Sequence, residues 1–530
     1  MGTIRPRWYV GAVLLSVVIA FTVALPDWTT RGENGSWWSR TAAPDGKELV
    51  QKHCGSCHVP VKPSALDRET WINSVLPQMA SKVGIGEIWG EYYADPSGAG
   101  PSLSLSEWQQ IVEYFEAEAP DTLNVPVSPD FAETDLPLFS VREPEWTSDA
   151  RPATVMVAVD ASARNVYYSD ATAGQTYRSD APLTASTSVS SLPATVDVHF
   201  LPDSSGGRHG VFTSIGTMRP VDRAYGDVRS VHLGSDSSRV LARNLPRPVR
   251  SVPGDFNRDG LRDWIVCGFG YTRGGLYLLE QQPDGTFEKS VVRGVPGAID
   301  ARVGDFNNDG YPDVMALFAQ GNEGMWLFTN DRRGGFEGES LLRFPSVYGS
   351  TSFQLVDVND DGRRDIVYTA GDNADYSQIL KPYHGIYIFI NQGHFDYEQS
   401  YFYHLNGATE AVAADFDEDG DLDIGAIAFF ADIEDESVRD FVYLEQTGSL
   451  KFEPHAPPIH QYGSWMAMDA GDYDGDGDVD LILGNYAPES YMNLKKRDAD
   501  AASRLPFIVL ENTTRSGLTN RTNMSAPDAP

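Results

Sequence analysis

The stretch DFNRDGLRD, from Asp255 to Asp263, places acidic or amide side chains at alternate positions next to a single glycine. Four further copies follow along the chain: DFNNDGYPD from Asp305, DVNDDGRRD from Asp357, DFDEDGDLD from Asp415 and DYDGDGDVD from Asp472. The first aspartates of successive copies are 50, 52, 58 and 57 residues apart. A motif that returns at a nearly constant interval indicates a structural repeat.

Each copy is followed by apolar runs with strand character, such as WIVCGFG from Trp264 and GLYLLEQ from Gly275. About four strands fit into each unit, which is the spacing of β-propeller blades. Two units without the acidic motif begin at Thr154 and Val196. The sequence therefore predicts an all-β propeller over residues 150–513, with seven blades and with six or eight as alternatives. An early strand near Thr154 is expected to close the ring, and residues 514–530 are expected to be a disordered tail.

The acidic motif has the oxygen-rich chemistry that binds a hard cation, and Ca²⁺ fits it best. Side chains at positions one, three, five and nine are the expected ligands, which allows up to five Ca²⁺ ions. They are Asp255, Asn257, Asp259 and Asp263; Asp305, Asn307, Asp309 and Asp313; Asp357, Asn359, Asp361 and Asp365; Asp415, Asp417, Asp419 and Asp423; and Asp472, Asp474, Asp476 and Asp480. The loops also account for much of the net charge of −34, which argues against a nucleic-acid partner.

A second motif lies near the N-terminus, in QKHCGSCHVP from Gln51. The order C-x-x-C-H is the attachment signature of c-type haem. Cys54 and Cys57 would hold one covalent haem c through thioethers, and His58 would be the proximal iron ligand. A zinc site needs a second ligand pair, which residues 30–190 do not contain, and a thioredoxin-like pair needs a βαβ context that is absent here. Met79 is the candidate distal iron ligand.

The surrounding residues predict a small all-α domain over residues 44–120. Its last helix is expected to begin at Ser104 or Ser106 and to bury Trp108, Ile111 and Phe115, which recur at helical spacing. Residues 27–43 and 121–149 are expected to be linkers.

The N-terminal residues 1–26 combine a basic flank with an uncharged stretch over residues 8–25. This pattern predicts either a cleaved signal peptide or an anchor in the cytoplasmic membrane. The expected location is therefore the bacterial periplasm or the cell exterior.

Residues 250–515 resemble the FG-GAP/VCBS repeat family, whose calcium-loop blades also form the propellers of integrin α chains. Residues 44–120 resemble the small class I cytochrome c family through CGSCH, the segment VLPQMA and a closing aromatic helix. The combination implies a multi-domain chain in which a haem domain precedes a propeller.

The first functional hypothesis is one-electron transfer with an unknown redox partner, either a protein or a small-molecule donor, and with the propeller as a docking module. The alternative is a dehydrogenase site in the propeller that delivers electrons to the haem, and a second alternative is cell-surface recognition or adhesion. No catalytic residue is assigned, and whether the chain is an enzyme stays open. Residues expected at a channel mouth are Arg250, Asp300, Ser352, Glu410 and Trp465. A polar insert over residues 369–385 adds Asp372, Asn373, Asp375, Lys381, Tyr383 and His384.

Overall fold

The computed structural model describes residues 45–88, 91–94, 103–126, 138–202, 207–235, 237–373, 379–429, 439–488 and 504–515. The predicted signal or anchor, the predicted linker 27–43 and the predicted tail from residue 516 onward lie outside these residues. Among the described residues, no helix is long and apolar enough to cross a membrane.

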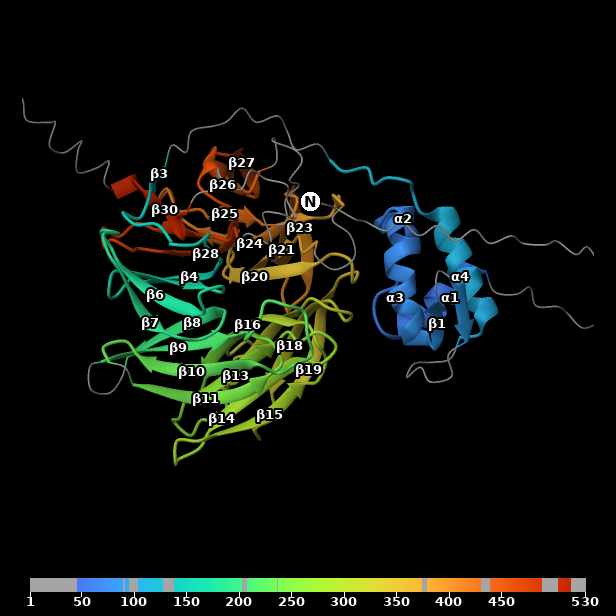
Figure 1. Cartoon of the computed structure of the whole chain (residues 1–530), viewed down its shortest axis with the longest axis horizontal. Coiled ribbons are helices and arrows are strands. Elements are labelled where there is room, and N and C mark those ends of the chain that lie inside the picture. The colour runs from blue at the N-terminus through green and yellow to red at the C-terminus, as the bar shows by residue number, and fades with distance from the viewer. Residues whose placement is uncertain are drawn as a thin grey trace, which may run out of the picture. The chain divides into compact units, whose positions relative to one another are not determined.

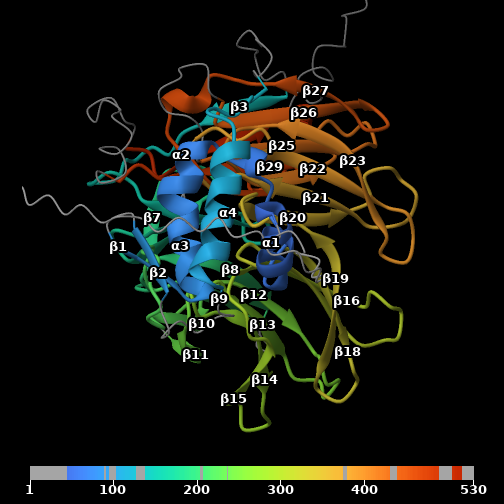
Figure 2. The same cartoon turned by 90° about the vertical axis from the view of Figure 1, so that its right-hand side faces the viewer.

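Residues 45–118 form a small helical region (Figures 1 and 2). Its helices are α1 Gly46–His53, α2 Arg68–Thr70, α3 Leu76–Ala80 and α4 Leu105–Glu118, with short 3₁₀ turns at Cys54–Ser56, Pro63–Ala65 and Ser81–Val83. A π-helical turn, Trp71–Val75, joins α2 to α3. It lies just before Pro77, which has no N–H to donate to the preceding turn, and a wider turn is one way to accommodate that loss.

Polar side chains begin the two longer helices. Asp45 accepts a hydrogen bond from the Glu48 N–H at the start of α1. Ser104 and Glu107 form a reciprocal capping box at the start of α4, which decides between the two predicted caps in favour of Ser104. The apolar face of α4 then buries Trp108, Ile111 and Phe115 as predicted, in one cluster with residues of the other helices.

Helices α1 and α4 approach each other closely at Gly46. A Cβ atom at this position would lie 2.3 Å from the Gln110 carbonyl oxygen and 2.5 Å from the Tyr114 Cβ atom. Any larger side chain would therefore push the two helices apart.

The expectation of an all-α domain is wrong in one respect. Two short strands, β1 Ile85–Ile88 and β2 Glu91–Ala94, pair as an antiparallel hairpin between α3 and α4. The segment is rich in isoleucine and tyrosine, which favour strands over helices.

The rest of the chain confirms a seven-bladed propeller. Among the described residues, seven four-stranded antiparallel sheets are present, which we number as blades 1 to 7. Figure 1 shows the sheets around a common centre. From the innermost strand outward, blade 1 is β4 Thr154–Asp160, β5 Asn165–Asp170, β6 Gln175–Asp180 and β7 Ser186–Ser190; blade 2 is β8 Thr195–Pro202, β9 Arg208–Ser214, β10 Gly226–His232 and β11 Ser238–Leu245; blade 3 is β12 Pro248–Gly254, β13 Asp263–Gly268, β14 Gly275–Gln281 and β15 Phe287–Arg293; blade 4 is β16 Ala298–Gly304, β17 Asp313–Phe318, β18 Gly324–Asn330 and β19 Phe336–Arg343; blade 5 is β20 Ser350–Val356, β21 Asp365–Ala370, β22 Gly385–Asn391 and β23 Tyr397–His404; blade 6 is β24 Ala408–Ala414, β25 Asp423–Ala428, β26 Phe441–Gly448 and β27 Lys451–His455; and blade 7 is β28 Trp465–Gly471, β29 Asp480–Asn485, β30 Phe507–Asn512 and β3 Phe139–Arg142.

Packing between blades explains why the second strand of blades 3 to 7 is almost wholly apolar. Every residue of β13, β17, β21, β25 and β29 is buried, because both faces of a blade are covered by its neighbours. Between blades 3 and 4, for example, Ile265 and Leu278 share one hydrophobic cluster with Val314 and Phe328. The innermost strands contact one another in cyclic order, from β4 through β28 and back to β4.

The ring closes through a different strand from the one predicted. The strand Thr154–Asp160 is the innermost strand of blade 1, and the missing outer strand of blade 7 is Phe139–Arg142. It pairs antiparallel with Phe507–Asn512. The segment 121–149, which the sequence predicts as a linker, therefore includes the closing strand.

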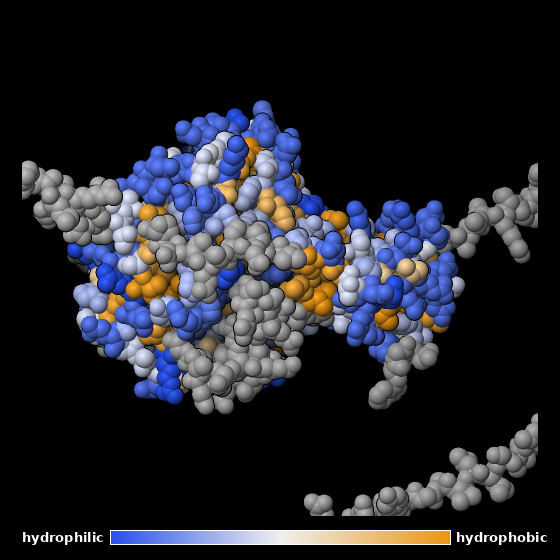
Figure 3. Space-filling model, turned by 90° about the horizontal axis from the view of Figure 1, so that it is seen from above, coloured by the Kyte–Doolittle hydropathy of each residue, from blue (hydrophilic) through white to orange (hydrophobic). Residues whose placement is uncertain are grey.

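The surface view of Figure 3 shows a face on which hydrophilic residues predominate. Among the described residues, the large hydrophobic side chains that are exposed are Tyr93, Tyr225, Tyr271 and Val291. They are scattered along the sequence, which is ordinary for a folded protein.

Candidate functional site

The five acidic motifs form loops of one kind, which we call loops 1 to 5. Each loop joins the innermost strand of a blade to its second strand, in blades 3 to 7. Because the same connection is used in each blade, all five loops lie at the same end of the propeller.

Loops 1 to 3 hold themselves together by hydrogen bonds. In loop 1 the Asp255 carboxylate accepts from the Asp259 N–H at 3.1 Å and from the Gly260 N–H at 3.0 Å. The Asn257 amide donates to Asp259 at 3.1 Å. Loops 2 and 3 repeat this pattern, and each adds an arginine to the carboxylate at position five: Arg332 contacts Asp309 and Arg363 contacts Asp361.

Loops 4 and 5 differ because position three is an aspartate instead of an asparagine. The carboxylates at positions one, three and five come together, each offering an oxygen within 4.8 Å of the others. Among the described residues, these two groups are the ones with three acidic or imidazole ligands close enough to hold a metal ion: Asp415, Asp417 and Asp419, and Asp472, Asp474 and Asp476. Burial, with help from neighbouring acids, raises the pKa of Asp478 to about 7 and that of Asp480 to about 8. Such crowding is what a bound cation would relieve.

The aspartate at position nine has a second role that the sequence reasoning missed. Asp263 is fully buried and accepts hydrogen bonds from the Phe256 N–H at 3.1 Å and the Gln281 N–H at 2.8 Å. It therefore ties its loop to the third strand of the blade. The other four loops repeat both bonds or one of them, through Asp313, Asp365, Asp423 and Asp480. Their predicted role as cation ligands stays a prediction.

The CGSCH segment follows directly on α1. The Cys57 and His58 N–H groups lie 3.4 Å and 3.5 Å from the Cys54 carbonyl oxygen, so the motif forms one helical turn. Both thiols are free, with Cys54 partly buried and Cys57 exposed. The His58 Nδ1 atom lies 2.9 Å from the Val59 carbonyl oxygen. Since a carbonyl only accepts, Nδ1 carries the proton and Nε2 is left as the basic nitrogen.

Met79 lies on α3 and packs, like Cys54, against the hydrophobic cluster of the helical region. The residues present therefore fit a c-type haem in two respects: two thiols without disulfides on one turn, and an imidazole whose Nε2 atom is free to bind iron. The predicted role of Met79 stays a prediction.

The described part of the polar insert is largely buried, which a solvated loop does not predict. Asn373, Lys381 and His384 are buried, and the Lys381 ammonium donates to Asn373 at 2.5 Å. Tyr383 stacks on Tyr348 with ring centroids 4.7 Å apart. Asp372 is described, whereas Asp375 lies outside the described residues.

The innermost strands bring charged residues together around the central channel. In each of these seven strands, the pairing with the second strand shifts register between the first and the third residue. The third residue of each strand is therefore at an equivalent position, which we call the same level of the channel. From blade 1 to blade 7, the residues at this level are Met156, Asp197, Arg250, Asp300, Ser352, Glu410 and Ala467. Two positions further along, on the same face of each strand, they are Ala158, His199, Val252, Arg302, Gln354, Val412 and Asp469.

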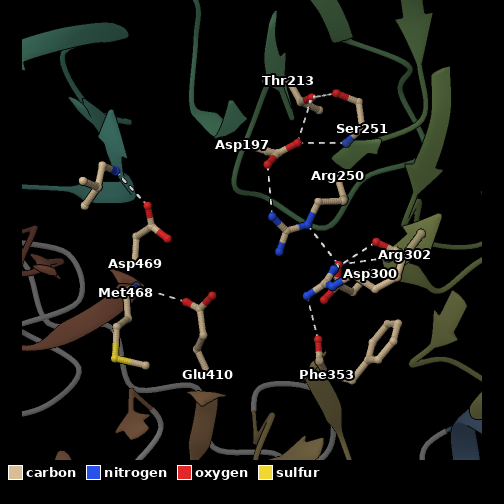
Figure 4. Close-up of polar contacts among 12 residues, drawn as sticks. Asp197, Thr213, Arg250, Ser251, Asp300, Arg302, Phe353, Glu410, Met468 and Asp469 are labelled. Atoms are coloured by element: carbon tan, nitrogen blue, oxygen red, sulfur yellow. Dashed lines mark hydrogen bonds and ion pairs between the residues drawn. The ribbon is translucent and has the colours of Figure 1, made fainter. Parts of the chain in front are cut away.

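Figure 4 shows how Arg250 is held on one side of this channel. Its Nε donates to Asp300 at 2.9 Å and its Nη1 donates to Asp197 at 3.1 Å. Arg302 donates to the same Asp300 oxygen at 2.5 Å. Burial would raise the pKa of Asp300, but the two guanidinium groups outweigh it and hold that pKa below its ordinary value.

Two carboxylates elsewhere in the channel have no such partner. Glu410 accepts from the Met468 N–H at 3.0 Å, and Asp469 accepts from the Val159 N–H at 2.7 Å. No ion pair of either side chain occurs among the described residues. Burial raises the pKa of Glu410 to about 7 and the pKa of Asp469 to about 6.

Four of the five residues expected at the channel mouth lie at equivalent positions along the channel, but within the innermost strands and not just before them as expected. Arg250, Asp300, Ser352 and Glu410 are equivalent to one another, whereas Trp465 is fully buried and lies two residues before the equivalent Ala467. Sequence reasoning missed Asp197 because blade 2 lacks the acidic loop that marks the register. It missed Arg302 and Asp469 because it considered one position in each innermost strand, and these two residues lie two positions further along.

Comparison with known proteins supports the repeats. The family model for the FG-GAP-like repeat matches residues 255–316 and 305–368, so the chain contains FG-GAP-like repeats. Similar solved structures include virginiamycin B lyase from Staphylococcus aureus, with 11% identity over 70% of this chain and 98% of that chain and a TM-score of 0.42. The calcium-binding protein regucalcin from Agrobacterium tumefaciens has 8% identity over 71% of this chain and 94% of that chain, with a TM-score of 0.37. These likenesses concern the fold alone, and no curated protein matches the chain.

The raised pKa of Glu410 predicts a specific dependence of stability on pH. Between the ordinary pKa of 4.5 and the folded-state value of about 7, the folded protein keeps a proton that the unfolded chain has released. The free energy of unfolding contributed by this group therefore falls as pH rises through that window. Glu410→Gln removes the effect but keeps an oxygen that can accept from Met468, so its melting temperature should rise relative to the wild type between about pH 5 and about pH 8.

The matched control is Glu453→Gln, which removes an exposed carboxylate from the outermost strand of the same blade. Its melting temperature should follow that of the wild type at every pH, with calcium kept saturating throughout. Parallel pH curves for Glu410→Gln and the wild type would contradict the assignment.

Proposed function

We propose that this protein is an exported c-type cytochrome that transfers single electrons, with a calcium-stabilised propeller as its docking and binding module. The observation that carries the proposal is the helical turn over CGSCH, in which His58 Nδ1 lies against a carbonyl oxygen and leaves Nε2 available. A haem held there supplies reversible one-electron oxidation and reduction of iron.

In this proposal the chain's own residues have separate tasks. Cys54 and Cys57 would provide the covalent attachment, which keeps the group on the protein. The bond from Nδ1 to Val59 orients the His58 ring and fixes its tautomer, which makes Nε2 a better ligand. Met79 is proposed as the ligand on the opposite side, where a thioether favours a higher reduction potential.

Covalent haem is the first expected outcome. The full chain, produced in a host that matures c-type cytochromes, should show haem absorption that survives denaturation and acid–acetone extraction. The double variant Cys54→Ala/Cys57→Ala should lose it, because the thioether bonds cannot form. Cys267→Ala is the matched control, since this buried propeller cysteine is not part of the motif. A wild-type protein without covalent haem would overturn the proposal.

The proposed role of Met79 predicts a second outcome. Met79→Ala should remove the weak red absorption of a His/Met pair and should lower the reduction potential, because a sulfur ligand favours the reduced iron. Met325→Leu, a buried change in blade 4, should leave both unchanged. A spectrum and a potential that Met79→Ala does not alter would assign the opposite side of the iron to another ligand.

Calcium in the loops is proposed on the grouping of carboxylates in loops 4 and 5. At a free Ca²⁺ concentration about 100 times the Kd, each bound ion stabilises the folded state by about 2.7 kcal/mol. Chelation should therefore lower the melting temperature of the propeller. Asp417→Asn and Asp474→Asn should each reduce this shift, because they give loops 4 and 5 the asparagine that loops 1 to 3 carry. A melting temperature that chelation leaves unchanged would count against bound calcium.

A further inference from the structure

The end of the propeller opposite the acidic loops carries a locally basic surface on blades 2 and 3. The connections 215–225 and 269–274 each join the second strand of a blade to its third strand, so both lie at that end. Together they contain three arginines and one acidic residue: Arg219, Arg223, Arg273 and Asp222. The whole chain has the opposite balance, with 75 acidic residues against 41 lysines and arginines. The equivalent connections of blades 1, 4 and 5 contain no arginine, so this basic character is not a general property of the blades.

The three arginine side chains are exposed. Among the described residues, none of them forms an ion pair with a carboxylate. Arg223 donates to the Tyr225 hydroxyl at 2.8 Å, and this neutral partner leaves the charge of the guanidinium uncompensated. The surface can therefore offer its arginines to carboxylates from outside the chain.

The single acidic residue of this surface is used to join the two blades. Asp222 accepts from the Thr272 N–H at 2.7 Å, from the Thr272 hydroxyl at 2.5 Å and from the Arg273 N–H at 3.1 Å. These bonds, helped by the charge of Arg273, lower the pKa of Asp222. The two connections are thus held together before any partner binds, which reduces the entropy cost of binding.

A third connection strengthens this arrangement. Arg247, between blades 2 and 3, donates to the Gly270 carbonyl oxygen at 3.0 Å. Its guanidinium also lies over the Phe269 ring, 5.5 Å from the centroid. The base of the connection 269–274 is therefore fixed against its neighbour.

Two exposed tyrosines on the same connections are an independent sign of a binding surface. Tyr225 is 52% exposed and Tyr271 is 48% exposed. They are two of the four large hydrophobic side chains that are exposed among the described residues, and the topology brings both to the arginines. Arginine and tyrosine are enriched where proteins contact one another, because tyrosine supplies a large rigid area and arginine a planar set of donors.

A protein with exposed carboxylates fits this surface better than an anionic membrane. The rest of the chain is strongly acidic and would repel an extended anionic surface. A protein can instead present a few carboxylates to blades 2 and 3 alone. The guanidinium group also matches a single carboxylate with two parallel hydrogen bonds.

We propose that Arg219, Arg223, Arg273, Tyr225 and Tyr271, which we call the arginine–tyrosine surface, dock an acidic segment of a partner protein. Carboxylates of the segment contact the arginines, and an apolar side chain between them packs on the tyrosines. In giving a surface and a partner chemistry to the docking module, this inference rests on the proposed function. The surface itself is built without any residue of the CGSCH segment.

Fluorescence anisotropy with the full chain tests the proposal. The probe is a dye-labelled peptide of alternating glutamate and glycine with one central tryptophan, and the reference is the same peptide with glutamine in place of glutamate. The glutamate peptide should bind and the glutamine peptide should not. The double variant Arg223→Gln/Arg273→Gln should weaken binding roughly tenfold, because two charged contacts are lost.

Ionic strength separates a charged contact from a merely structural role. Raising it from about 0.01 M to about 0.15 M shortens the screening length from about 30 Å to about 8 Å, so binding to the wild type should weaken. Binding to the double variant should change much less. Tyr271→Ser should weaken binding by a similar factor at both ionic strengths, because the tyrosine ring contributes an apolar contact.

The matched control is Arg333→Gln, which removes an exposed arginine from the turn between β18 and β19, at the end of the acidic loops. It should bind the peptide as the wild type does, and all variants should melt at the wild-type temperature because the changed side chains are exposed.

The proposal is overturned if the glutamate peptide does not bind, or if the double variant binds it as the wild type does. Displacement of the peptide by vesicles of phosphatidylglycerol would assign the surface to a membrane instead. Oligomers of the wild type that the double variant does not form in sedimentation would assign it to a second copy of the chain. Either result also overturns the proposal. Haem content, measured on the same samples, reports separately on the proposed function.

Discussion

The propeller depends on one strand pairing, between Phe139–Arg142 and Phe507–Asn512. An open array of blades would leave the last sheet incomplete, and full closure protects such edges. The Arg142 guanidinium grips the Glu511 carboxylate with two parallel bonds of 2.7 Å and 2.8 Å, between residues 369 positions apart. Because the two strands come from opposite ends of the propeller sequence, the ring can close only after most of the chain has been ordered.

Acidic side chains in this ring have three kinds of surroundings, and the differences between them indicate where a cation could bind. Asp263 is neutralised by backbone N–H groups, so it is a structural brace. Asp300 is held in its ionised form by two guanidinium groups. For Asp417 and Glu410, hydrogen bonds and nearby cations do not fully offset the cost of burial, so the pKa of each is raised. Acids that the fold compensates explain stability, whereas those that it leaves uncompensated are the candidates for cation binding.

The sequence was informative wherever a local rule decides the structure. The five acidic motifs predicted the loops and the blade interval, and Ser104 and Ser106 were the two predicted starts of the last helix, of which the structure has Ser104. These predictions succeed because capping and turn chemistry act over a few residues. The closing strand could not be found in this way. Phe139–Arg142 has only four residues, and its identity as a strand comes from a partner at the far end of the chain. The residues of the channel were predictable only in part, because their register depends on a local marker. Register is marked where a loop motif lies downstream, but one position per strand does not reveal the next position on the same face, where Arg302 and Asp469 lie.

The sheets of the propeller and the CGSCH turn are built from different parts of the chain. None of the seven sheets contains a residue from 45–118, so the ring is complete without the CGSCH segment. Conversely, the hydrogen bonds of the CGSCH turn and of the His58 ring all lie within that segment. The charged channel is built only from the innermost strands of the blades, whereas the chain enters the propeller through the outermost strand of blade 7. The CGSCH turn and the channel are therefore formed by separate sets of residues.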